Sequence, residues 1–427
     1  MPAKAAQLEA EAPDIWRETV RFIEAGDWLV WQLTGFEVRS ACQAGHKAHY
    51  QAGEGYPTYP FKIDLESRIS EPVAVGTSAG SLRSQWLERT GLTGLTGSPV
   101  VAVATIDAHA AVPAIGVSKP GVLVGIMGTS ASHLLLDPQR LEVQGISGVV
   151  MDGILPGLWG YEAGQAGFGD LLNWFVRSFP SGQTDGESFT HYNLQAAKLA
   201  PGQTGLVALD WWNGCRTPLM NAELSGLMIG MTLTTTPTDI YRAILESLCY
   251  GTRTVLETFR RGNAQLHRLV LTGGLAERNP LLMQLVADIT GLRVDVPEVS
   301  QASARGVAMH GAVAAKVVPD FAAAVVRYGA KNVKAFEPRT AAQAIFNDLY
   351  AIYSELSASL GDARVMQQLK ALRHWANIWV SSSRSFSLSF QRRGEQRDCA
   401  GASVGAHRCS RLAHTVKDHA LVSQQRL

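Results

Sequence analysis

The sequence has no run of eighteen apolar residues, and its first residues, Met1 to Trp16, lack the apolar core of a secretion signal. We therefore expect neither a membrane-spanning helix nor a cleaved leader. The five cysteines are scattered and form no Cys-x-x-Cys pair. This pattern predicts neither a disulfide framework nor a zinc site, and a reducing cytoplasm is the simplest compartment.

A strong charge of either sign is also absent, because 38 basic residues face 37 acidic ones and the net charge is +1. This balance argues against a general attraction to nucleic acid or to membranes. The exception is the C-terminal end, where eight basic and three acidic residues follow position 373. No helical or strand period continues there, so residues 373–427 are predicted to be a basic tail that is disordered or non-native.

The rest of the chain alternates strand-like and helix-like segments, which predicts α/β layers in two or three domains. A capping box with proline at the first helical position marks the clearest helix. The predicted elements are helices within 6–34, a buried strand Val100–Ile106, a hairpin of Gly121–Met127 and Leu134–Leu136, a helix from Thr236, a strand Leu269–Leu271, a helix from Asn279, and helices within 302–316 and 339–372.

Asp107 is the first candidate for chemistry, because it follows an apolar run and precedes a Gly116 turn. Open α/β sheets place reactive groups at such strand ends, where a carboxylate can accept the proton of a substrate hydroxyl during phosphoryl transfer. The local sequence alone favours the other interpretation, that Asp107 is a helix N-cap or a solvated loop end.

Two glycine turns are candidates for binding phosphate. Gly128-Thr129-Ser130 offers backbone N–H groups and hydroxyls, although such a turn is also ordinary hairpin chemistry. Gly273-Gly274 follows a strand and precedes a helix, as in nucleotide sites, but a glycine pair is also a common tight turn.

Other polar residues carry weaker signals. Lys47 is suited either to hydrogen-bond a polyol ligand or to lie on the solvated surface. Glu162 lies among small residues that let a ligand approach the backbone. The dispersed histidines are interpreted as structural, because no pair has metal-ligand spacing; they are His46, His109, His133 and His310.

The order of these motifs along residues 5–372 resembles the ribulokinases of the FGGY family of carbohydrate kinases. The Ala-Gly-His-Lys tetrapeptide and the segment Asp210–Pro218 are the most discriminating. The motifs that carry the resemblance are Glu24–Trp28, Ala44–Lys47, Thr105–His109, Met127–Ser130, Glu162–Gln165, Leu209–Pro218 and Thr272–Ala276.

The resemblance implies an α/β, actin-like ATPase (ribonuclease H-like) fold in which two domains flank a cleft. Residues 1–116 resemble only the later part of the first domain, and 117–372 a largely complete, nucleotide-binding second domain. The implied reaction is phosphorylation of L-ribulose to L-ribulose 5-phosphate by ATP with Mg²⁺, a step of L-arabinose catabolism. The implied protein is cytoplasmic and without nucleic-acid or membrane partners, and a homodimer is compatible with the family.

Carried over residue by residue, the resemblance makes Asp107 the catalytic base and places Lys47, Asp107 and Glu162 around the ketopentose. Six residues match the nucleotide site: Gly128 and Thr129 at the phosphates, and Gly169, Asn173, Gly274 and Arg278 in the adenine-nucleotide pocket. No residue matches a metal ligand of the protein itself.

One family motif is missing, because no Asp-x-Gly-Ser/Thr pattern occurs anywhere in the chain. In this fold that pattern opens the first domain and holds Mg²⁺-phosphate, so we expect the 427-residue chain alone to be inactive. Two alternatives stay open: a nucleotide-binding fragment without turnover, and a kinase for another ketopentose such as xylulose, against which Asp210–Pro218 argues.

Overall fold

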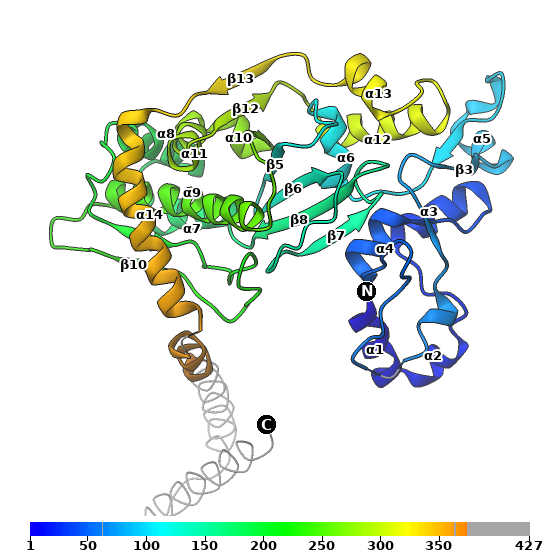
Figure 1. Ribbon diagram of the computed structural model, residues 1–427, viewed down its shortest axis with the longest axis horizontal. Coiled ribbons are helices and arrows are strands. Elements are labelled where there is room, and N and C mark those ends of the chain that lie inside the picture. The colour runs from blue at the N-terminus through cyan, green and yellow to red at the C-terminus, as the bar shows by residue number, and fades with distance from the viewer. Residues whose placement is uncertain (62, 363, 374–427) are drawn as a thin grey trace, which may run out of the picture. The chain divides into compact units, whose positions relative to one another are not determined.

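The computed structural model describes residues 1–61, 63–362 and 364–373 (Figure 1). Residues Met1–Met366 form one compact unit. The predicted boundary between 116 and 117 falls in the loop that follows α6 (Asp107–Ala114), and it stays a prediction. Apart from Arg373, the predicted tail lies outside the described residues.

A seven-stranded sheet is the centre of this unit. Its order is β13-β12-β11-β5-β6-β8-β7, with β11 parallel to both β12 and β5 and the remaining pairs antiparallel. The strands are β5 (Val122–Met127), β6 (Ala131–Asp137), β7 (Gly148–Met151), β8 (Trp159–Gln165), β11 (Arg268–Thr272), β12 (Arg293–Pro297) and β13 (Val333–Phe336). The predicted hairpin is confirmed as β5 and β6, which turn at residues 128–130.

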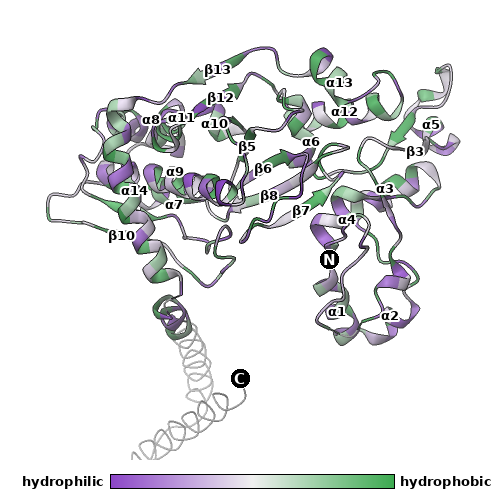
Figure 2. Cartoon of the chain, viewed as in Figure 1, coloured by the Kyte–Doolittle hydropathy of each residue, from purple (hydrophilic) through white to green (hydrophobic). Residues whose placement is uncertain are grey.

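Helices cover both faces of the sheet because its central strands are apolar on both sides. Leu123 and Met127 face one hydrophobic cluster and Val122 and Val124 the other, as the two-residue period of a strand requires. Figure 2 shows β5 and β6 as hydrophobic. The first face carries α7 (Gly169–Ser178), α8 (Asp185–Ala196), α9 (Pro237–Arg261), α11 (Pro280–Thr290) and α14 (Thr340–Gly361), and the second carries α6, α12 (Ala302–Ala314) and α13 (Phe321–Tyr328).

The predicted helix starts are confirmed by their caps. Thr236 Oγ1 accepts the N–H of Asp239, and Asp239 Oδ2 accepts the N–H of Thr236, which completes the capping box of α9. Asn279 caps α11 through the N–H of Leu282. Further along, α12 and α14 lie within the predicted helical ranges.

The predicted buried strand Val100–Ile106 is wrong in extent. Only Val100–Ala102 forms a strand, β4, whose side chains stay partly exposed. Its partner β3 (Ser78–Ser81) pairs no further than Ala102. The next residues lead into α6 instead, so the apolar run supplies a helix entry rather than a sheet core.

The N-terminal helices are α1 (Pro2–Glu11), α2 (Pro13–Glu18), α3 (Ala25–Thr34), α4 (Ala41–Ala48) and α5 (Ser84–Thr90), and the first three occupy the predicted helical range 6–34. A close contact places α4 on the central sheet. A Cβ atom at Gly45 would overlap the side chain of Val150 in β7, so α4 packs there only because residue 45 is glycine. The amide of Gln51 also donates to the Val149 carbonyl at 3.1 Å. This packing brings Lys47 close to the strand pair β7–β8.

A buried polar network ties α14 to the sheet. The Asp210 carboxylate accepts hydrogen bonds from the Tyr353 hydroxyl and the Gln165 amide, both at 2.8 Å. Gln165 in turn accepts a bond from Thr252 and contacts the His133 ring. Burial raises the pKa of Asp210, and these two donors oppose that shift. Asp210, part of one of the motifs that carry the resemblance, therefore has a structural role here.

Replacing Tyr353 with Phe should destabilise the protein by about 1–3 kcal/mol, because one oxygen of a buried carboxylate loses its donor. Equilibrium denaturation of the variant and the parent measures the difference. Tyr350→Phe is the control, since within the described residues its hydroxyl makes one hydrogen bond, to Thr254 in a partly buried position, and its loss should cost less. Equal losses in the two variants would contradict the assigned role of Asp210.

Candidate functional site

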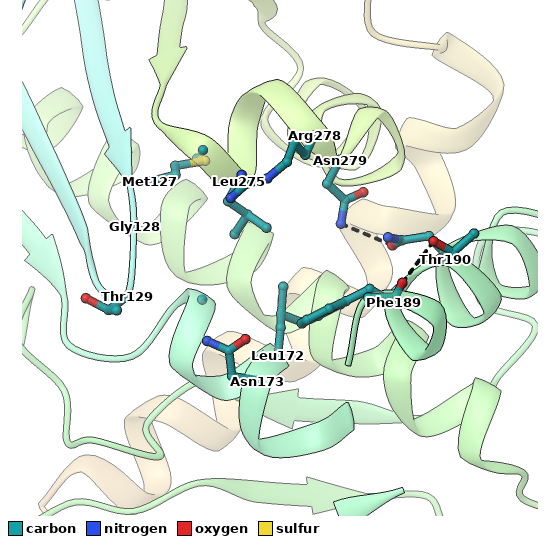
Figure 3. Close-up of a pocket in the computed structure, with 14 residues that line it drawn as sticks. Met127, Gly128, Thr129, Leu172, Asn173, Phe189, Thr190, Leu275, Arg278 and Asn279 are labelled. Carbon is teal, nitrogen blue, oxygen red and sulfur yellow. Dashed lines mark hydrogen bonds between the residues drawn. The ribbon is translucent and has the colours of Figure 1, made fainter. Parts of the chain in front are cut away.

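A cavity of about 570 Å³ opens between the β5–β6 turn and helices α7, α8 and α10 (Gly274–Arg278) (Figure 3). All six residues predicted for the nucleotide line it: Gly128, Thr129, Gly169, Asn173, Gly274 and Arg278. In Figure 3, Thr129 and Asn173 lie on one side, and Arg278 and Asn279 on the other. Residues far apart in the sequence therefore share one concave surface.

The wall that holds the predicted phosphate turn is built from two backbone segments in direct contact. The N–H of Gly169 donates to the Gly128 carbonyl at 3.0 Å, and the N–H of Phe168 donates to the Thr129 carbonyl at 2.9 Å. A Cβ atom at Gly169 would lie 2.6 Å from the Gly128 carbonyl oxygen. Glycine is thus required at 169 for the hairpin turn to reach the start of α7.

The opposite wall depends on the predicted glycine pair. Gly273 has φ of 100°, and a Cβ there would lie 2.6 Å from the Met127 carbonyl oxygen, so this residue lets β11 end tightly against β5. The guanidinium of Arg278 folds back over Gly274, where a Cβ would lie 2.6 Å from its Nη2 atom. Arg278 therefore presents its positive charge at the cavity wall.

Sequence reasoning missed the residues that α8 contributes to the cavity, which are Gly186, Phe189, Thr190 and Asn193. The helix itself had a detectable start, because Thr184 caps it through the N–H of Glu187. Nothing local shows which face of α8 meets a cavity, since that follows from its packing on α7 and α9.

Asn193 is held in one amide orientation by its neighbours. The side-chain Oδ1 atom of Asn279 accepts the Leu282 N–H, so the side-chain Nδ2 atom must point the other way and donates to Asn193 Oδ1 at 3.1 Å. The Tyr241 hydroxyl donates to the same oxygen at 3.0 Å. The remaining group of Asn193, its NH₂, is left as a donor for a ligand in the cavity.

The three residues predicted for the sugar, Lys47, Asp107 and Glu162, lie outside the lining of this cavity and come from α4, α6 and β8. Asp107 is exposed at the first position of α6, and its carboxylate accepts the Ala108 N–H at 2.8 Å. Glu162 opposes Leu134 in the β6–β8 register, which puts it three residues from the end of β6 nearest the turn at residues 128–130. That distance is about 10 Å along a strand.

Two histidines contact Glu162. Its Oε2 atom lies 3.4 Å from His109 Nε2 and 3.6 Å from His46 Nδ1, and the two imidazole rings meet edge to face at 4.5 Å. Burial alone would raise the pKa of Glu162, but His109, His46 and the nearby Lys47 charge outweigh it and lower the pKa to about 2. Glu162 is therefore an ionised acceptor at neutral pH.

The interpretation of the four dispersed histidines as structural stays a prediction, but two of them lie together. His46 and His109 are 63 positions apart but converge, because α4 packs on β7 and both rings reach Glu162 in the neighbouring strand β8. With Glu162 they form, within the described residues, one group whose ligand atoms lie within 4.8 Å of one another, a spacing that a metal ion can bridge. Two imidazoles and a carboxylate suit a transition metal better than Mg²⁺.

Known proteins match this chain over most of its length. The model of the "FGGY family of carbohydrate kinases, C-terminal domain" matches residues 123–315. The ribulokinase of Bacillus licheniformis is 40% identical over 87% of this chain and 70% of its own length. The chain belongs to the FGGY family of carbohydrate kinases. A second FGGY relative, the ribulokinase of Halalkalibacterium halodurans, is 41% identical with the same coverage.

Solved FGGY structures share the fold. A xylulose kinase from Rhodospirillum rubrum superposes with a TM-score of 0.73 at 21% identity, covering 84% of this chain and 71% of that one. The glycerol kinase of Plasmodium falciparum, solved with ADP, gives 0.68 at 15% identity, covering 82% and 70%. The predicted α/β actin-like ATPase fold is confirmed. Membership of this family implies ATP and a sugar as substrates and, usually, a divalent metal.

In this FGGY kinase, no helix among the described residues is both long enough and apolar enough to traverse a bilayer.

Proposed function

We propose that this chain transfers the γ-phosphoryl group of ATP to the terminal hydroxyl of L-ribulose, forming L-ribulose 5-phosphate. The observation that carries the proposal is the cavity that gathers all six nucleotide residues predicted from motif order. The relatives of about 40% identity named as ribulokinases support the choice of sugar.

The residues present suit the roles this reaction needs. Gly128 and Thr129 offer a turn for the phosphates, and Arg278 supplies a cation at the nucleotide wall. Asp107 is exposed and free to accept the proton of the attacking hydroxyl, while ionised Glu162 accepts hydrogen bonds from other hydroxyls of the sugar. Lys47 adds a donor beside Glu162.

Mg²⁺ fits this site as the partner of ATP rather than as a resident ion. The cavity lining contains no carboxylate, so the phosphates of ATP themselves would hold the ion. In this proposal, Asp107 is the exposed carboxylate that lies nearest the reacting groups. Its chemistry would be to neutralise charge on the transferring phosphoryl group.

A second candidate function is ATP binding without turnover. The observation that favours it is the absence of an Asp-x-Gly-Ser/Thr pattern from the sequence, because that pattern holds Mg²⁺-phosphate in this fold. Both candidates share the nucleotide cavity and differ in whether a sugar stimulates ADP release.

One experiment separates these readings. ATP binding to the purified chain is measured by calorimetry, and ADP release is then followed with L-ribulose and with D-xylulose as acceptors. Release that depends on L-ribulose supports the kinase, and faster release with xylulose reassigns the sugar. Binding without release supports the second candidate, and no ATP binding excludes both.

Within this proposal, Asn193→Asp should raise the dissociation constant of ATP by about tenfold or more, because it replaces the ligand-facing NH₂ donor with an oxygen. The substitution keeps the size of the side chain and the acceptor used by Tyr241 and Asn279. Calorimetric titration measures the effect. Thr190→Val is the matched control in the same cavity, since the Thr190 hydroxyl is already bonded to the Gly186 carbonyl. Unchanged affinity in Asn193→Asp would remove Asn193 from nucleotide recognition.

A further inference from the structure

Three buried ring nitrogens beside Glu162 have no hydrogen-bond partner within the described residues. They are Nδ1 and Nε2 of His46 and Nε2 of His109. The His46 side chain is 3% exposed and that of His109 is fully buried, so bulk water does not reach them. Leaving buried polar atoms without partners is costly, and an ion that bonds to them removes this cost.

Two of these nitrogens lie near the same carboxylate oxygen. Glu162 Oε2 is 3.6 Å from His46 Nδ1 and 3.4 Å from His109 Nε2. Hydrogen bonds from nitrogen to oxygen are usually about 2.7–3.2 Å long, so both separations are too long for good ones. The three atoms nevertheless stay within 4.8 Å of one another. Their spacing therefore asks for something other than direct hydrogen bonds.

The spacing suits a tetrahedral metal ion. Zinc lies about 2.0–2.2 Å from imidazole nitrogen and carboxylate oxygen, so neighbouring ligand atoms at the corners of its tetrahedron are about 3.3–3.6 Å apart. The two separations from Glu162 Oε2 fall in this range. An ion among the three atoms needs only small side-chain movements, and its fourth position stays free. Glu162 is one-fifth exposed, so its side of the group offers the ion a way in.

The neighbouring residues hold both rings in the orientation that an ion requires. His109 Nδ1 lies 3.1 Å from Cys42 Sγ, which leaves Nε2 turned toward Glu162. A contact at the outer nitrogen is usual for histidines that bind metals. The His46 ring lies against β7, where a Cβ atom at Gly148 would be 2.5 Å from its Nδ1 atom.

The ligand types determine which ion the group prefers. Mg²⁺ takes oxygen ligands and keeps several waters, whereas zinc and its spectroscopic substitute cobalt(II) bind imidazole readily. Glu162 is the one anion among the three ligands, and the Lys47 charge lies near it. General attraction for cations is therefore small, and binding depends on the two imidazole bonds.

We propose that His46, His109 and Glu162 bind one transition-metal ion of the zinc class, and that the bound ion excludes the sugar. The first part rests on the geometry of the three ligands. The second rests on the proposed function, because it assumes that Glu162 accepts hydrogen bonds from L-ribulose. An oxygen bonded to the ion no longer offers the sugar the same acceptor, so zinc at this site inhibits the kinase.

Cobalt(II) titration of the chelator-treated chain tests the metal site. Tetrahedral cobalt absorbs visible light much more strongly than the hydrated ion, so one equivalent should produce this absorption. His46→Phe keeps the ring but removes a ligand, and should weaken cobalt binding by more than about 100-fold, because losing even an outer-shell partner costs about 10–100-fold. An excess of Mg²⁺ should leave the parent spectrum unchanged.

The matched control is His310→Phe. Like His46, His310 is buried, lies on a helix, contacts another ring edge to face and has two unpartnered ring nitrogens. It belongs to no group with metal-ligand spacing among the described residues. Its replacement should leave cobalt binding unchanged. ATP affinity checks the folding of each variant, and Glu162→Gln provides a second ligand variant should His46→Phe fail to fold.

Competition with the sugar is measured without ATP, because nucleotide phosphates bind metal ions themselves. Saturating Zn²⁺ should raise the dissociation constant of L-ribulose about tenfold or more in the parent chain. The same Zn²⁺ should have no effect in His46→Phe. In metal-free buffer this variant should bind L-ribulose like the parent, since His46 is not assigned to the sugar.

The outcomes separate this inference from the proposed function. A tetrahedral cobalt spectrum that His46→Phe abolishes supports the metal site, whether or not the chain phosphorylates a sugar. No such spectrum, or one that persists in His46→Phe, overturns the site. Unchanged L-ribulose affinity with the ion bound overturns the exclusion of the sugar. A parent chain that binds cobalt at this site but no L-ribulose in metal-free buffer overturns the proposed function and the exclusion, and leaves the metal site standing.

Discussion

Replacing Asp107 with Asn is expected to lower the rate of L-ribulose phosphorylation by about 10²–10⁴-fold, the usual contribution of a general base. The amide keeps the size of the side chain and can still accept the Ala108 N–H. It cannot accept the proton of the attacking hydroxyl. ATP affinity should not change, because Asp107 lies outside the nucleotide cavity.

Steady-state rates and calorimetric ATP titrations of the same preparations measure the two quantities. Asp185→Asn is a suitable control, because Asp185 also occupies the first position of a helix and is exposed, yet has no role in the proposed chemistry. Turnover of Asp107→Asn at the parent rate would remove Asp107 from the base role. A parallel loss of ATP affinity would instead indicate a general disturbance of the fold.

Local signals in the sequence were sufficient for elements whose ends are fixed by their own residues. The capping box at Thr236, the Asn279 cap and the Gly-Thr-Ser turn each specify backbone hydrogen bonds over four residues or fewer, and all three form as predicted. The extent of β4 depended on how far β3 could pair with it. Because that pairing is a tertiary property, the apolar run alone predicted too long a strand.

The candidate site also combines features with a local sequence signal and features that depend on tertiary packing. Motif order brought together the six residues predicted for the nucleotide, because four of them lie at a backbone turn or helix start with its own local signature and the other two, Asn173 and Arg278, follow four residues after such a start. The approach of His46 and His109 to Glu162 had no such signature, since it results from packing α4 on β7 through Gly45 and α6 on α12 through Gly306. Side chains that meet only through helix packing have no fixed spacing in a sequence.

Gly306 provides the second large effect, because it sets how closely α12 approaches the helix that carries Asp107 and His109. A Cβ atom at residue 306 would overlap the Ala110 carbonyl oxygen of α6 and lie 2.5 Å from its carbonyl carbon. Backbone atoms cannot rotate away as a side chain can, so α6 or α12 must shift. We expect Gly306→Ala to destabilise the protein by about 3 kcal/mol, at the upper end of the cost of overpacking.

The control for this prediction is on the same helix. A Cβ at Gly311 meets nothing within 4 Å, so Gly311→Ala should be neutral or stabilise the protein by up to about 1 kcal/mol through helix propensity. Denaturation midpoints of both variants give the stability difference, and L-ribulose affinity reports the displacement of α6, since Asp107, which is predicted to contact the sugar, moves with that helix. Because the two substitutions are chemically identical, intrinsic helix preference cancels between them and the difference isolates the α6–α12 contact. Equal stabilities would show that the two helices separate at little cost. The α6–α12 contact would then not be what determines the position of Asp107.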